Sequence, residues 1–253
     1  MTVGDIYQIL DRIAPFDTQA DFDNSGLLIG SPAWEVSGVL FALDVTEAVV
    51  EEAVALGANL IVTHHPVLFS PVQRITEDQP EGRLIAALIR NRLSLIAAHT
   101  NLDQAPGGIN DTLAALCGLS DVTGEGYVRI GNLPEACSAR ELADRLSGIL
   151  QCTVRLMGPE EAVIDRLAVS SGAGGSEWKA GADAGCSAFL SGEIKHHHAL
   201  SLAACGIVSL ECGHYATEAP GIRTLALALQ NALDEIEWKM RVFVSKIPAY
   251  SFP

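Results

Sequence analysis

Short apolar runs alternate with amphipathic stretches along this chain, and the alternation limits the folds open to it. Residues 39–43, 59–63 and 93–98 have the length and apolar character of buried strands. Between them lie stretches with helical spacing, at 47–56 and from about 80 to 92. This order of elements indicates βαβ units, and therefore an α/β fold built on parallel sheet.

The second half of the chain repeats this order, with strands expected at 167–170, 187–190 and 206–210. The halves share few identical residues, so an internal duplication is a hypothesis that depends on the matched order of elements. We predict one α/β domain over 1–126 and a second over 127–236. The run 239–244 alternates like an edge strand, which allows the segment 237–253 to join the first domain, although either half can accept it.

Composition excludes several classes of protein. The 253 residues include 16 Lys and Arg against 31 Asp and Glu, which gives a formal net charge of -15. A chain that is 49% apolar is not a disordered one, and the absence of any basic run disfavours nucleic acid or an anionic membrane as a partner. The first eleven residues have no basic segment typical of a secretory signal. We therefore expect a cytoplasmic protein with a small-molecule substrate.

All seven histidines follow predicted strands, at the strand end or a few residues beyond it. They are residues 64, 65, 99, 196, 197, 198 and 214. Open α/β sheets form their sites at the carboxyl ends of parallel strands, because the loops there converge. The histidines are therefore the candidate site.

A mixed set of imidazoles and carboxylates among these loops is typical of a metal site. Adjacent side chains on an extended segment point apart and cannot easily bind one ion, but at a strand end bent by Pro66 we expect His64 and His65 to give one ligand to each of two neighbouring ions. Asp103 and Glu218 supply carboxylates and His214 a further imidazole, a set that suits two divalent ions of Zn, Mn, Fe or Ni. In the alternative interpretation the histidines are polar turn residues and the two acids lie at helix N-termini.

The run 196–198 is expected at a helix start, where consecutive side chains fan out, so one or two of them can face the site. We predict that Glu193 or His197 reaches it as a proton-transfer group or as a partner of a ligand, and His99 is a similar candidate. The turn at 171–175 is Gly-rich. It could bind a phosphate through its N–H groups. It lacks the GK[ST] ending of a P-loop, however, so a tight turn is the favoured interpretation.

Five motifs together resemble one known family, the GTP cyclohydrolase I type 2 homologues, also called Nif-three-like proteins. The resemblance covers nearly the whole chain. The motifs are DNSGLLIG (23–30), THHP (63–66), AHTNLD (98–103), SGEIKHHHAL (191–200) and GHYATE (213–218). It implies two intertwined α/β domains, a dinuclear metal centre in the cleft between them, and a ring-shaped homohexamer. The metal ligands that it implies are His64, His65, Asp103, His214 and Glu218.

Three functions are compatible with these features. The leading hypothesis is a dinuclear metal-dependent hydrolase, and for GTP the family name implies that water attacks C8 of the purine and formate is released. A metal-handling or regulatory protein, with the 196–198 run as a transfer station, is the main alternative. The third possibility is an interaction scaffold whose metals only hold the two halves together.

Overall fold

The computed structural model describes residues 1–247, and these form two compact units. The first unit is Met1–Ala105 with the described part of Ile222–Pro253, and the second is Pro106–Gly221. The chain thus divides at 105/106 and 221/222, where the sequence suggested 126/127 and 236/237. The first difference arises because the segment after residue 105 packs on the second sheet, through Leu113, Ala114 and Cys117.

The first unit contains a five-stranded sheet in the order β1-β4-β3-β2-β11. Strands β2, β3, β4 and β11 are parallel and β1 is antiparallel to β4. The strands are β1 (Gly26–Ile29), β2 (Val39–Ala42), β3 (Leu60–Thr63), β4 (Ser94–Ala97) and β11 (Val242–Val244). Every residue of β2, β3 and β4 is buried, as expected for parallel strands that are covered on both faces. The C-terminal strand pairs with β2, so it belongs to the first sheet.

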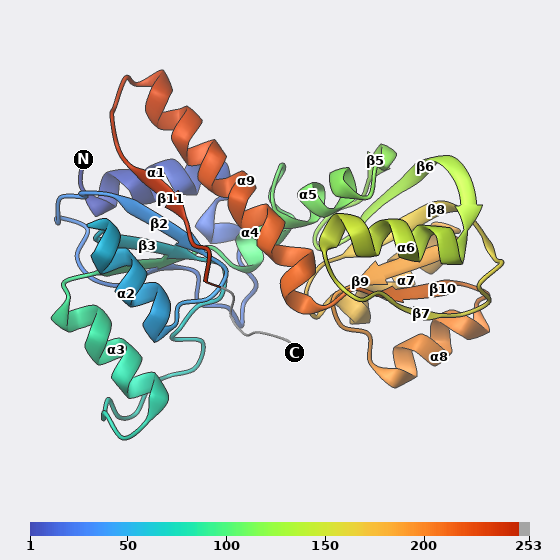
Figure 1. Ribbon diagram of the computed structural model, residues 1–253, viewed down its shortest axis with the longest axis horizontal. Helices are drawn as coiled ribbons and strands as arrows, with labels where there is room; N and C mark the ends of the chain where they lie inside the picture. Colours follow the sequence, from blue (N-terminus) through green and yellow to red (C-terminus); the bar gives the residue numbers. More distant parts are fainter. Residues whose placement is uncertain (248–253) are drawn as a thin grey trace. The chain divides into compact units, whose positions relative to one another are not determined.

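Helices α2 and α3 cover one face of this sheet (Figure 1). The helical segments of the first unit are α1 (Val3–Ile13), η1 (Phe16–Thr18), α2 (Glu47–Leu56), α3 (Pro80–Arg90) and α4 (Thr100–Gln104). Leu40, Ile61 and Leu95 point from alternate positions of their strands into the layer formed by α2 and α3, where Val50 and Leu88 meet them. Helix α9 (His214–Glu235) begins in the second unit and ends in the first.

The second unit contains a six-stranded sheet in the order β5-β6-β8-β9-β10-β7. Strands β8, β9 and β10 are parallel, and the other three pair antiparallel. The strands are β5 (Ser120–Thr123), β6 (Arg129–Ser138), β7 (Arg155–Met157), β8 (Val163–Ser170), β9 (Ala188–Ser191) and β10 (Val208–Glu211).

Separate apolar clusters cover the two faces of the second sheet. Its helical segments are α5 (Ile109–Leu116), α6 (Ala139–Leu150), η2 (Gly174–Glu177), α7 (Trp178–Asp183) and α8 (His196–Ala204). Leu167 and Leu190 pack with α5 and α6, whereas Ala168 and Phe189 pack with α7 and α8. The mixed α/β architecture expected from the sequence is confirmed. In the part of the chain that the structure describes, no helix has the length and apolar character needed to cross a membrane.

Candidate metal centre

Two adjacent histidines follow β3 in a bend that begins where the strand ends at Thr63. The backbone N–H groups of both His64 and His65 donate to the carbonyl of Leu43, at 3.1 Å each. The segment is therefore not extended, and the two rings lie on the same side with centroids 4.9 Å apart. Strand alternation ends at Thr63, so the two histidines lie in a bend directly before Pro66, as expected.

His64 is fully buried. Its Nδ1 lies 2.8 Å from the carbonyl oxygen of Ala98. A carbonyl can only accept, so Nδ1 carries the proton and the lone pair of the ring is on Nε2. That Nε2 lies 3.5 Å from Oδ1 of Asp103, on helix α4 after β4. The structure therefore brings together an imidazole acceptor and a carboxylate of the predicted ligand set.

His65 has the arrangement of a ligand held by a carboxylate. Its Nδ1 donates to Oδ1 of Asp44 at 2.7 Å, and Asp44 directly follows Leu43 at the end of β2. A carboxylate behind an imidazole fixes the ring and its tautomer, which is the usual environment of a metal-bound histidine. Asp44 was not predicted as a site residue. Its position at the end of a strand adjacent to β3 was the available signal.

His99 lies with the other two imidazoles of the first unit. The centroid of its ring is 5.0 Å from that of His64 and 5.6 Å from that of His65, and the three residues offer ligand atoms within 4.8 Å of one another. His99 Nδ1 is 2.8 Å from Oδ1 of Asp23. His99 was expected beside the site, and the geometry allows it to be a third imidazole ligand.

Asp23 is a fully enclosed carboxylate behind His99. Besides His99, it accepts hydrogen bonds from the Thr100 N–H at 3.0 Å and the Ser25 hydroxyl at 2.9 Å. Burial alone would raise the pKa of Asp23, but the hydrogen bonds from His99 and Thr100 outweigh it and hold this pKa well below its ordinary value. Asp23 is thus an anion with a positioning role, which sequence reasoning did not assign although DNSGLLIG contains it.

In the second unit, His214 lies between two carboxylates. Its Nδ1 is 2.7 Å from Oε1 of Glu193, which follows β9, and its Nε2 is 3.0 Å from Oε2 of Glu218. Glu218 is 4% exposed. The pair is spaced i,i+4 on α9, so both side chains lie on one face of the helix.

Helix α9 begins before the position that local sequence signals favour. Proline is common at a first helical position, yet α9 begins at His214 and contains Pro220. The loop after β9 packs closely against the first residue of the helix: a Cβ on Gly192 would lie 2.9 Å from the Cα of His214 and 2.5 Å from the carbonyl oxygen of Gly172. The contact between Gly192 and His214 therefore lies at the first turn of α9, although the two residues are 22 positions apart in the sequence.

The Gly-rich turn at 171–175 lies against Glu218. Two of its N–H groups have partners within the second unit: Ser171 N–H donates to Oδ1 of Asn110 at 2.8 Å and Gly172 N–H to the Thr217 hydroxyl at 3.0 Å. Gly172 has φ of +51°, and a Cβ there would lie 1.9 Å from Oε1 of Glu218. These contacts favour the tight-turn interpretation over a phosphate cradle.

We expect Gly172→Ala to weaken metal binding about 10- to 100-fold, the range found when the groups that hold metal ligands are disturbed. The new methyl group would displace the Glu218 carboxylate. Competition with a coloured chelator measures the affinity. Gly185→Ala is the matched control, because Gly185 also has a positive φ, +68°, but has open space where its Cβ would lie. Equal loss in both variants would contradict a specific role for Gly172.

The three consecutive histidines begin α8. His196 and His197 are exposed, and the rings of His197 and His198 are 4.1 Å apart. Burial, with the charges of His197 and Lys195, lowers the pKa of His198. Among the described residues, the groups whose atoms could hold a metal include none of these three. The predicted role of His197 in proton transfer stays a prediction.

Comparison with known proteins gives consistent matches over the chain. The profile of the family described as Duf34/NIF3 (NGG1p interacting factor 3) matches residues 1–249. A protein of Streptomyces coelicolor named GTP cyclohydrolase 1 type 2 homolog is 35% identical, over 96% of this chain and 91% of that protein. One of the same name from Clostridium acetobutylicum is 30% identical, over 100% and 99% of the two chains. Among solved structures, Staphylococcus aureus protein SA1388 is 28% identical with a TM-score of 0.94, over 100% of this chain and 99% of that one.

Proposed function

Because the chain belongs to the Duf34/NIF3 family, we propose that it is a dinuclear metal-dependent hydrolase of a nucleotide or related small molecule. His64, His65 and Asp103 from the first unit, with His214 and Glu218 from the second, would hold two divalent ions. This donor set suits Zn, Mn, Fe or Ni. We also propose the homohexamer that the motif resemblance implies and the cytoplasmic location that the composition and N-terminal sequence led us to expect.

The observation that supports the proposal most is shared by the three histidines. Each of His64, His65 and His214 has Nδ1 at 2.7–2.8 Å from an oxygen of the protein. The oxygens belong to Ala98, Asp44 and Glu193. A metal-binding histidine characteristically donates its second ring N–H to a carboxylate or carbonyl, which directs the other nitrogen to the ion. The residues therefore fit divalent ions by their tautomers as well as by their types.

When bound, such ions act as Lewis acids and lower the pKa of a coordinated water. The chain itself would orient the imidazoles through Asp44 and Glu193. Glu193 has a further property: its side chain is 60% exposed while its Oε1 lies 2.7 Å from Nδ1 of His214. It can therefore hold the His214 proton and also exchange protons with solvent, as a general acid–base group must.

The proposal is tested by turnover of GTP and of a panel of nucleotides, peptides and phosphoesters by metal-loaded protein. GTP comes first because the relatives are named as GTP cyclohydrolase homologues. Metal-loaded protein that turns over none of the panel would contradict a hydrolase.

We expect Glu193→Gln to lower turnover about 10- to 100-fold at saturating metal. A glutamine can orient His214 through its amide oxygen but cannot take up a proton. Glu161→Gln, at an exposed acid of the same unit, is the control. Full activity of Glu193→Gln together with an inactive His197→Ala would assign proton transfer to His197 and contradict the role of Glu193.

A metal-handling protein without turnover is the second candidate. It is favoured by the exposed His196 and His197 at the start of α8, outside the described ligand groups. This function predicts rapid transfer of metal to an apo-acceptor, and alanine at 196–198 would slow the transfer. Transfer that is equally fast in that triple variant would exclude a role for the run.

A further inference from the structure

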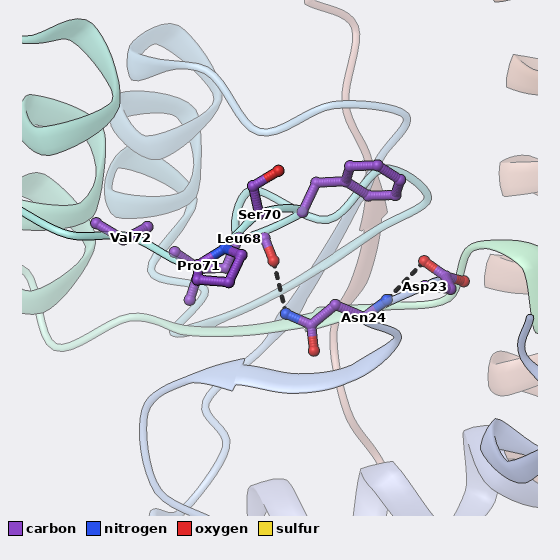
Figure 2. A pocket seen from close by; sticks show the side chains of 7 residues that line it. Asp23, Asn24, Leu68, Ser70, Pro71 and Val72 are labelled. Carbon is purple, nitrogen blue, oxygen red and sulfur yellow. Dashed lines mark hydrogen bonds between the residues drawn. The ribbon is translucent and has the colours of Figure 1, made fainter. Parts of the chain in front are cut away.

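A pocket of about 410 Å³ lies in the first unit, between the segment after η1 and the loop that follows His65 (Figure 2). Its described lining is Asp23, Asn24, Leu68, Phe69, Ser70, Pro71 and Val72. The volume is within the range of small-molecule sites, roughly 300–1,000 Å³. One side is closed by the Asn24 amide, which donates through Nδ2 to the Leu68 carbonyl at 2.6 Å and so ties the loop to the DNSGLLIG segment.

An exposed aromatic pair marks this pocket. Phe69 in its lining is 49% exposed, and Phe22 beside it is 68% exposed. Their ring centroids are 6.4 Å apart, in an edge-to-face arrangement. Neighbouring exposed rings leave a continuous apolar surface in water, which is unfavourable in free energy. Such a surface marks a binding site more often than a single exposed apolar residue does.

The pocket and the imidazole cluster share a wall. Asp23 lines the pocket and also accepts the hydrogen bond from Nδ1 of His99. The ring of Phe69 lies 6.0 Å from that of His99, at an interplanar angle of 83°. A molecule held against Phe69 would therefore be adjacent to the histidines of the first unit.

We propose that this pocket binds the planar heteroaromatic ring of the substrate, with Phe69 as the stacking surface and Phe22 supporting it. The inference rests on the proposed function and names a subsite for it. The described residues that line the pocket include no Lys or Arg, so the pocket is suited to an uncharged ring and unsuited to phosphates. The Ser70 hydroxyl and the Asn24 amide supply polar groups at the rim for the ring nitrogens or exocyclic groups of such a ligand.

The test is calorimetric titration of the metal-loaded full chain with guanosine, GTP and inorganic triphosphate. Guanosine is expected to bind wild type, and Phe69→Ala to weaken binding of guanosine and GTP about tenfold, as one stacking contact is lost. Inorganic triphosphate has no ring, so its binding should not change. Phe69→Trp should retain binding of guanosine. Ile75→Ala is the matched control, because Ile75 is 54% exposed on the same loop but does not line the pocket.

The inference is overturned if guanosine does not bind wild type, or if Phe69→Ala binds guanosine as tightly as wild type does. A smaller oligomer of Phe69→Ala in light scattering would also overturn it, because Phe69 would then lie in a contact between copies. The proposed function fails separately. Guanosine binding without turnover of GTP or of any other member of the panel contradicts the hydrolase alone, whereas turnover of GTP with the same KM in Phe69→Ala contradicts the subsite alone.

Discussion

Asp103→Ala protein is expected to bind divalent metal more than about 100-fold more weakly than wild type, since disturbing only the groups behind metal ligands costs 10- to 100-fold. Asp103 Oδ1 lies 3.5 Å from Nε2 of the buried His64, and its side chain is 13% exposed. Its carboxylate is the anionic donor of the first unit's predicted ligand set. Without it, the first unit would offer only imidazoles to the positive charge, in a poorly hydrated place.

Metal affinity is measured by competition with a chelator of known strength, and metal content by elemental analysis. Asp17→Ala removes an exposed acid of the same unit and should bind metal as wild type does. Unchanged affinity in Asp103→Ala would remove Asp103 from the ligand set. A melting temperature measured in excess chelator separates loss of metal from loss of folding, because the two metal-free proteins are then compared directly.

Asp23→Asn is expected to destabilise the metal-free protein by about 2–4 kcal/mol at pH 7. The enclosed carboxylate accepts hydrogen bonds from His99, Thr100 and Ser25. An asparagine has the same shape, but its amide nitrogen must face donors where the second carboxylate oxygen accepted. Denaturation in urea with chelator present measures the change, and Asp21→Asn at an exposed neighbouring acid is the control. A stability equal to wild type would contradict this role of the network.

The same variant changes the dependence of stability on pH. The pKa of Asp23 is lower in the folded protein than in the unfolded chain, so folding favours the ionised form. This stabilisation is complete above the unfolded pKa of about 4 and is lost as pH falls below it. The difference in stability between wild type and Asp23→Asn should therefore be constant near neutrality and shrink below about pH 4. A difference that grows on acidification would contradict this sign.

The strands and the places where chemistry gathers were predictable from the sequence. Parallel strands buried on both faces give continuous apolar runs, and β2, β3 and β4 were recognised by them. Helix α2 has the bounds expected, because Thr46 caps it through a hydrogen bond to Val49 N–H, a signal that is local in sequence. The positions of the histidines at strand ends were predictable as well, because the loops at the carboxyl ends of parallel strands converge.

Features that depend on distant contacts were not predictable. Asp44 and Asp23 lie far in sequence from His65 and His99, which they hold. The early start of α9 lies at a close contact with Gly192, where local sequence signals favoured Pro220. The boundary between the units depends on which sheet the residues after 105 pack against, and no local sequence pattern encodes that choice.

Metal content per chain of gently purified protein tests the proposed dinuclear centre, with Asp103→Ala and His214→Ala analysed beside wild type. We expect close to two equivalents of transition metal in wild type and loss of both ions in either variant, because in the proposed site ligands from both units hold a common pair. Wild type that takes up no metal on titration would contradict the metal centre. Variants that each keep one tightly bound ion would contradict the shared pair.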